Sequence, residues 1–114
     1  MMISFEEELL IKKINPKKYL QAVQVKAMYF DYNWKTIKFA DDNKFKLQIT
    51  RPDGKIIKFG ASAYNDFIIY SFMAKKKLIT YDDALKHRDN FHKRMIIKDD
   101  NIYSARNLSL NLLW

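Results

Sequence analysis

Hydrophobic and polar residues alternate most regularly between Lys44 and Gly60. In the first half of this stretch the apolar residues take every second position, as Phe45, Leu47 and Ile49. That is the period of a strand with one buried side and one side facing solvent. The following Arg51-Pro52-Asp53-Gly54 predicts a tight turn, because proline presets φ and glycine accepts a left-handed conformation. We therefore expect a β-hairpin whose second strand runs from Lys55 to Gly60.

Alternation also marks the residues before the hairpin. Trp34 to Ala40 reads as a further strand, with Ile37 and Phe39 facing inward, and Asp41-Asp42-Asn43 then turns the chain. These segments predict an antiparallel meander of at least three strands. Residues 18–33 fit a strand about as well as a helix, and we expect a strand.

The remaining segments predict helices. Ser4 and Glu7 form a capping box for a short N-terminal helix that ends at Asn15-Pro16. After Gly60, Asn65 or Asp66 can cap a helix that ends in the run Lys75-Lys76-Lys77, where cations suit the helix dipole. Thr80 to Asp83 opens another helix, which should reach about Ile97 and be broken by Asp99-Asp100-Asn101. The apolar segment from Tyr103 to Trp114 should form a C-terminal helix that packs on the sheet or on a partner.

The expected fold is α+β: a meander of three or more strands packed with two to four helices, in a single domain spanning residues 1–114. The chain is long enough to bury a core. It has no cysteine, which excludes disulfides and thiolate metal sites and favours a reducing, intracellular setting. Its N-terminus lacks the pattern of a signal peptide, and its longest apolar run is too short to span a membrane.

The net charge of +8 comes from 21 Lys and Arg against 13 Asp and Glu, and a surface of this kind attracts polyanions. On the predicted sheet the solvent-facing side would gather Lys38, Lys44, Lys46 and Lys58. We interpret this as a basic face that contacts nucleic acid non-specifically, because lysine is a point charge and reads bases poorly. The alternative is that these lysines serve solubility and protect the sheet edge. No aromatic residue lies between them, so base stacking on this face is not indicated.

Only the segment from His87 to Arg94 resembles catalytic chemistry. A metal-dependent nuclease using His87, Asp89 and His92 is disfavoured, because two histidines five residues apart lie about 140° around a helix axis. We expect Arg88 or Arg94 instead to bind phosphate or to pair with an acid such as Asp66. Nucleotide-binding, nucleophile-elbow and zinc motifs are absent, so we expect no enzyme activity, metal or cofactor.

The C-terminal 60 residues resemble a small domain found in large nucleocytoplasmic DNA viruses. That family has a strand ending in Phe-Gly, a Tyr-x-Asp element, a Tyr-x-x-Arg-His helix and a closing Leu-Trp. The matching positions are Phe59, Gly60, Tyr64, Asp66, Phe91, Arg94, Leu113 and Trp114. Met95 departs from the pattern, since the family has histidine there. The resemblance implies a viral, intracellular protein of the host cytoplasm, nucleus or virion.

Two hypotheses follow. The first is a non-enzymatic protein that binds nucleic acid or an acidic protein surface through its basic residues. The second is a minor capsid or virion assembly protein, able to form homo-oligomers, that uses the apolar C-terminus as its contact. For the family motif we expect folding duties: Gly60 lets the chain leave the strand, Asp66 caps a helix and faces Arg94, and Trp114 fills a gap in the core.

Overall fold

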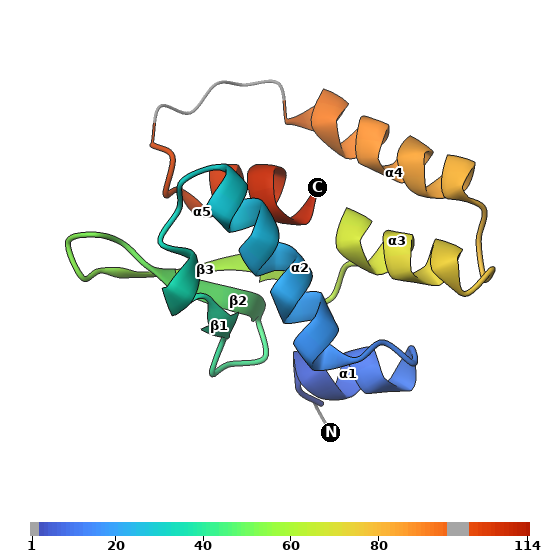
Figure 1. Ribbon diagram of the computed structural model, residues 1–114, viewed down its shortest axis with the longest axis horizontal. Helices are drawn as coiled ribbons and strands as arrows, with labels where there is room; N and C mark the ends of the chain where they lie inside the picture. Colours follow the sequence, from blue (N-terminus) through green and yellow to red (C-terminus); the bar gives the residue numbers. More distant parts are fainter. Residues whose placement is uncertain (1–2, 96–100) are drawn as a thin grey trace.

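The computed structural model describes residues 3–95 and 101–114, and it has the predicted α+β fold (Figure 1). In the sequence, helices precede and follow the three strands, which form one antiparallel sheet. The helices are α1 (Phe5–Ile11), α2 (Pro16–Tyr29), η1 (Trp34–Thr36), α3 (Phe67–Lys75), α4 (Tyr81–Arg94), α5 (Ala105–Leu108) and η2 (Ser109–Leu113). The strands are β1 (Lys38–Phe39), β2 (Phe45–Thr50) and β3 (Ile56–Ala61).

The predicted hairpin is confirmed. Strands β2 and β3 pair with Leu47 opposite Phe59 and Gln48 opposite Lys58. Gly54 closes the turn with φ of 89°, and its N–H donates to the Arg51 carbonyl over 2.9 Å. This left-handed glycine is the feature that the turn sequence predicts.

The strand predicted for residues 34–40 is much shorter than expected. Residues Trp34–Thr36 form a 3₁₀ turn, and only Lys38–Phe39 pair with β2. Side chains take over the missing backbone bonds, because the Thr36 hydroxyl accepts from the Thr50 N–H over 3.0 Å. The Asn33 amide likewise donates to the Thr50 carbonyl over 3.0 Å.

The strand expected within residues 18–33 is wrong, because this segment forms α2. The Asn15 side chain accepts from the N–H groups of Lys17 and Lys18, and Pro16 occupies the first turn. Asn15-Pro16 is therefore a start signal as well as a stop signal. The buried positions recur every four residues, at Tyr19, Val23 and Ala27, which is a helical period.

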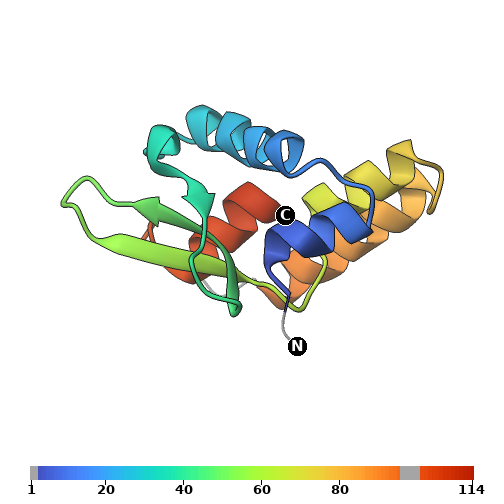
Figure 2. The same cartoon turned by 90° about the horizontal axis from the view of Figure 1, so that it is seen from below.

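Helix α2 lies across the sheet, and the C-terminal turns α5 and η2 pack against β3 and α2 (Figure 1 and Figure 2). Helices α3 and α4 run side by side at the end of the molecule opposite the hairpin turn (Figure 1 and Figure 2). Asp66 caps α3 by accepting from the Ile69 N–H over 2.8 Å, and the Thr80 hydroxyl caps α4. Both caps match the sequence prediction.

The predicted end of α4 near Ile97 lies outside the described residues. No described helix combines the length and apolar character needed to cross a bilayer.

The apolar C-terminus packs into the protein's own core, as one of its two predicted roles requires. Leu108, Leu112 and Leu113 are buried among residues of α1, α2 and the sheet. The Trp114 N–H donates to the Ser109 carbonyl over 3.2 Å, which closes a π-helical turn. Trp114 is only partly buried and packs against the edge of the core.

Candidate nucleic-acid interface

The predicted basic sheet face does not form. Lys38 and Lys44 are exposed, but Lys46 is only 2% exposed and its Nζ lies 2.9 Å from the Asp66 carboxylate. The period-2 alternation assigns Lys46 to one face of the sheet. That face contacts solvent only if no other element packs on it. Here α1 and the C-terminal turn cover it: Nζ lies 5.5 Å from the Phe5 ring centroid, and Leu113 packs beside Gly60, the residue opposite Lys46.

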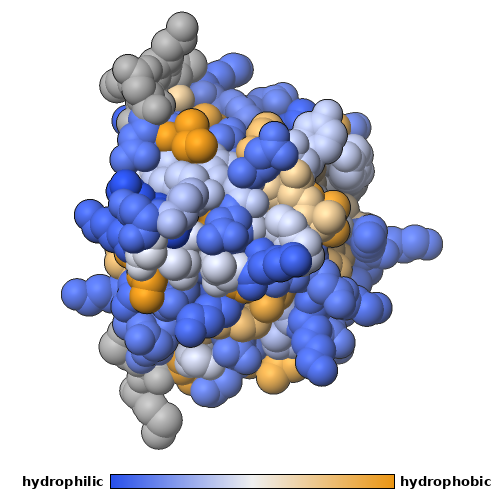
Figure 3. All heavy atoms as spheres, turned by 60° about the vertical axis from the view of Figure 1, so that its left-hand side comes forward, coloured by the Kyte–Doolittle hydropathy of each residue, from blue (hydrophilic) through white to orange (hydrophobic). Residues whose placement is uncertain are grey.

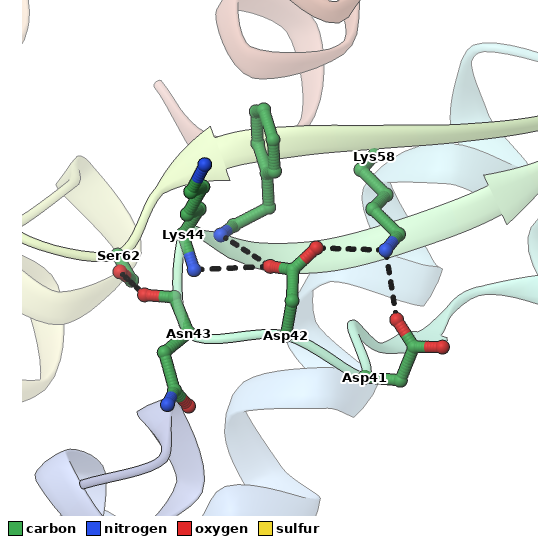
Figure 4. Close-up of polar contacts among 7 residues, drawn as sticks. Asp41, Asp42, Asn43, Lys44, Lys58 and Ser62 are labelled. Atoms are coloured by element: carbon green, nitrogen blue, oxygen red, sulfur yellow. Dashed lines mark hydrogen bonds and ion pairs between the residues drawn. The ribbon is translucent and has the colours of Figure 1, made fainter. Parts of the chain in front are cut away.

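Lys58 is neutralised by the turn that precedes β2. Its Nζ lies 2.8 Å from an Asp41 oxygen and 2.7 Å from an Asp42 oxygen (Figure 4). The other Asp42 oxygen accepts from the N–H groups of Lys44 and Phe45, each over 3.0 Å. Donation by Lys58, followed by that from the two backbone amides, lowers the pKa of Asp42 to about 2. Two of the four predicted sheet lysines therefore have acidic partners.

The depressed pKa of Asp42 predicts an acid-dependent stability. A carboxyl group whose pKa is lower in the folded state than in the unfolded chain stabilises the fold at pH values above about 4. That contribution should be lost as the pH falls from about 4 toward 2. Urea unfolding between pH 2 and pH 7 should show that Asp42→Asn destabilises the protein at neutral pH and has little effect near pH 2.

Asp82→Asn is the matched control, since Asp82 is an exposed carboxylate in the first turn of α4. We expect a smaller pH-dependent difference from the wild type for this variant. A destabilisation by Asp42→Asn that stays constant from pH 7 to pH 2 would contradict the assigned role of the carboxylate.

The predicted pairing of Asp66 with Arg88 or Arg94 is wrong. Asp66 is fully buried and its carboxylate accepts from Lys46 and from the Tyr19 hydroxyl, over 2.9 and 2.6 Å. Arg88 instead lies over the Phe67 ring, with its Cζ 5.2 Å from the ring centroid, and 3.8 Å from the Asp89 carboxylate. The acid nearest in sequence therefore partly neutralises Arg88.

The residues of the nuclease alternative do not converge on a metal. His87 stacks on Tyr70 with centroids 4.1 Å apart, and the His92 ring contacts the Trp114 carbonyl over 3.2 Å. Asp89 lies next to Arg88. Within the described part of the chain, no three His, Cys, Asp or Glu side chains are grouped so that they could hold a metal ion.

A pocket of about 1180 Å³ lies between the open end of the β2–β3 hairpin, α4 and the C-terminal turns. The hairpin contributes Phe45, Lys46, Gly60 and Ala61, the segment leading into α3 contributes Tyr64 and Asn65, and α3 itself contributes Tyr70. Helix α4 and its end contribute His87, Asn90, Phe91, Lys93, Arg94 and Met95, and the C-terminal turns contribute Ala105, Arg106, Ser109, Leu113 and Trp114. We refer to this as the basic pocket.

Among the described residues, the basic pocket is lined by three cations without an ion-pair partner and by no acidic side chain. Its lining, as far as the structure describes it, includes Lys93, Arg94 and Arg106 but neither aspartate nor glutamate. None of the ion pairs formed within residues 3–95 and 101–114 involves these three side chains. The Arg106 Nε is buried and has no hydrogen-bond partner in the described structure. The Arg106 side chain as a whole is only partly buried and lines the pocket, so its guanidinium group can bind an anion that enters the pocket.

Aromatic rings accompany these cations. Phe91 and Trp114 stack with centroids 4.3 Å apart and planes 3° from parallel. The Arg94 Cζ lies 5.9 Å from the Phe91 centroid, within the range of a cation–π contact. Tyr70 connects this pair to His87, because it stacks on His87 and lies 6.2 Å from the Trp114 ring centroid. The pocket therefore brings aromatic rings and positive charge together on one surface.

Of the predicted anion-binding residues, only Arg94 and Lys46 line this pocket, and Lys46 is already paired with Asp66. Lys93 and Arg106 were missed because nothing in the sequence near them indicates that α4 and α5 line the same pocket. The positions that carry the resemblance to the viral domain cluster at this pocket. Six of the eight matching positions line the pocket: Gly60, Tyr64, Phe91, Arg94, Leu113 and Trp114.

The surface on the hairpin side is mostly hydrophilic, and its hydrophobic residues form several separate patches (Figure 3). In the apolar C-terminus expected to mediate assembly, Leu108, Leu112 and Leu113 are at most 1% exposed, whereas Leu110 and Trp114 are partly exposed. The three buried leucines pack within the chain, so only Leu110 and Trp114 of this segment offer apolar surface to a partner.

Comparison of the chain with protein-family models, curated proteins and solved structures found no match, so the interface rests on its own geometry.

Proposed function

We propose that the protein binds nucleic acid without sequence specificity and that the cations of the basic pocket contact the phosphates. One observation carries the proposal: Lys93, Arg94 and Arg106 line one concave surface, and the described residues provide no acidic partner for them. Phosphate contacts of this kind supply affinity but do not distinguish bases.

Nucleic acid fits the pocket better than an acidic protein surface does. A carboxylate-rich protein would satisfy the cations but would leave the exposed ring of Tyr64 without a complementary group. Nucleic acid provides phosphates and planar bases on the same chain, and base stacking on aromatic side chains is independent of sequence. We therefore treat poly-glutamate as a competitor that should bind more weakly than DNA of equal charge at the same ionic strength.

The resemblance to the viral domain family agrees with this choice of site, because most of the motif positions line the basic pocket. It sets the proposed activity in an infected cell or a virion, and this context is part of the proposal. No catalytic step is required of the pocket for such a role.

Binding should depend on salt in a way that reports the number of phosphate contacts. Three cations would give a slope of log affinity against log salt of about −2 to −3, since each contact contributes about −0.7 on single strands and −0.9 on duplex. Fluorescence anisotropy of a labelled oligonucleotide between 50 and 300 mM salt measures this slope. A slope near zero would contradict the proposed phosphate contacts.

Arg94→Gln should weaken binding and reduce the magnitude of the salt slope by about 0.7 to 0.9. Arg51→Gln is the matched control, because Arg51 is a partly exposed arginine at the hairpin turn, away from the pocket lining, and is paired with Asp53. This control should keep the wild-type slope. Equal effects of the two substitutions would show that general surface charge, and not the basic pocket, attracts the nucleic acid.

A further inference from the structure

The aromatic lining of the basic pocket is arranged for more than phosphate contact. Tyr64 lines the pocket and yet remains 73% exposed. Trp114 lines another part of it and is partly exposed. An exposed phenol ring at the margin of a basic recess is a surface on which an unpaired base can stack. A continuous duplex offers no such base, because its bases are already stacked on one another.

The partial burial of Arg106 also favours a single strand over a duplex as the ligand. The Arg106 Nε is buried, and the rest of its side chain is only partly exposed. A phosphate must therefore enter the recess to meet this guanidinium. The backbone of a single strand is flexible enough to do so, whereas the phosphates of a duplex lie on a stiff, convex surface. Lys93 and Arg94 are exposed and remain accessible to either form.

The size of the recess is compatible with a short stretch of strand. Its volume of about 1180 Å³ exceeds the ~300–1,000 Å³ usual for pockets that hold one small molecule. A ligand larger than one drug-sized molecule can therefore be accommodated. A polymer that threads through the recess fits this volume and the positions of the cations on two sides, from α4 and from α5.

We infer that the basic pocket binds single-stranded nucleic acid, with an unpaired base stacked on Tyr64 and phosphates held by Arg94 and Arg106. This inference rests on the proposed function and specifies its ligand. Lys46 takes no part, because Asp66 already neutralises it. The single strand is selected by two features that a duplex cannot use together, an exposed ring and a recessed guanidinium.

The test compares Tyr64→Ala with Tyr29→Ala. Both tyrosines are exposed, 73% and 84%, so neither substitution should unfold the protein, but only Tyr64 lines the pocket. The probes are labelled oligo(dT), an abasic oligomer of the same length, and a duplex of the same length. The wild type should prefer oligo(dT), and Tyr64→Ala should weaken oligo(dT) binding by at least about fivefold, the lower end for loss of one stacked base. Tyr29→Ala should leave the affinity unchanged.

A second measurement reports on the pocket directly. The chain has two tryptophans, so Trp34→Phe leaves Trp114 as the only one. Oligo(dT) should change the fluorescence of Trp114 in this variant, and the abasic oligomer should change it less. Equal affinity for duplex and single strand, together with equal effects of Tyr64→Ala and Tyr29→Ala, would overturn this inference and leave non-specific binding intact. Failure of all three probes to bind would overturn the proposed function as well.

Discussion

Asp66→Ala is expected to lower the free energy of unfolding by about 4–6 kcal/mol, and this is the largest effect that we expect of any single substitution. Loss of one partner from a buried ion pair typically costs about 3–5 kcal/mol, because the other charge remains buried without compensation. Asp66 is fully buried and Lys46 is 2% exposed, so water cannot replace the lost contact easily. Loss of the helix cap on α3 adds about 1 kcal/mol.

Three elements depend on this carboxylate. One oxygen accepts from the Tyr19 hydroxyl of α2 over 2.6 Å and from Lys46 of β2 over 2.9 Å, and the other accepts from the Ile69 N–H of α3. Burial, and then the charge of Asp66, raises the pKa of Tyr19 well above 10. Its hydroxyl therefore remains a donor throughout the physiological range. Asp66 thus connects the sheet to two helices.

The double variant Asp66→Asn with Lys46→Met separates charge from shape. If the cost comes from an uncompensated buried ammonium group, removing that group should recover much of the stability lost in Asp66→Asn alone. Urea unfolding of the two single variants and the double variant gives the coupling free energy. Additive effects, without recovery, would contradict a dominant role of the ion pair.

A typical domain is stable by only about 5–15 kcal/mol, so Asp66→Ala itself could be unfolded at 25 °C. Tyr19→Phe provides a milder measurement on the same network. It keeps the buried ring and removes one hydrogen bond to Asp66, which should cost about 1–2 kcal/mol. A Tyr19→Phe variant as stable as the wild type would argue against the network independently of Asp66.

The sequence was sufficient to predict features whose signal is local. The hairpin turn at Gly54 and the caps at Asp66 and Thr80 each depend on a few neighbouring residues, and each is present in the structure. The error in residues 18–33 has a local cause too. Asn15-Pro16 was interpreted as a stop, although the same pair begins α2 by capping and by proline at the first helical position.

The basic pocket could not be predicted in this way, because its parts are far apart in the sequence. The alternation within β2 predicts that Lys46 faces solvent. In the structure α1 and the C-terminal turn pack on that face of the sheet and bury Lys46. Nothing in the sequence around Arg106 indicates a binding site, because the site depends on the packing of α5 beside β3. Side-chain alternation identifies the face of a strand, but it does not show what packs on that face.

Gly60→Ala is expected to destabilise the protein by about 2–5 kcal/mol, the second largest effect. Gly60 has φ of 77°, which costs an L-amino acid roughly 1–2 kcal/mol. A Cβ atom there would also lie 2.7 Å from Leu113 Cδ1 and 3.3 Å from Lys46 Cδ. Both neighbours are at most 2% exposed, so neither can move aside freely, and overpacking of this kind costs about 1–3 kcal/mol.

Gly54→Ala is the matched control for the cost of placing alanine at a positive φ. Gly54 also has a positive φ, of 89°, but nothing lies within 4 Å of a Cβ atom built on it. Urea unfolding of both variants, at equal m-values, therefore separates conformational strain from steric overlap. The excess cost at Gly60 should be at least about 1 kcal/mol. Equal losses at the two glycines would mean that the C-terminal turn yields to the added methyl group.

The consequence for the pocket follows from the same contact. Leu113 precedes Trp114, whose ring stacks on Phe91, and Gly60, Leu113 and Trp114 all line the basic pocket. A methyl group that displaces Leu113 should therefore shift Trp114 and weaken oligonucleotide binding at temperatures where Gly60→Ala is still folded, whereas Gly54→Ala should bind like the wild type. If folded Gly60→Ala binds the oligonucleotide as tightly as the wild type, the close packing at Gly60 is not needed for binding. The glycine would then contribute only to the stability of the fold.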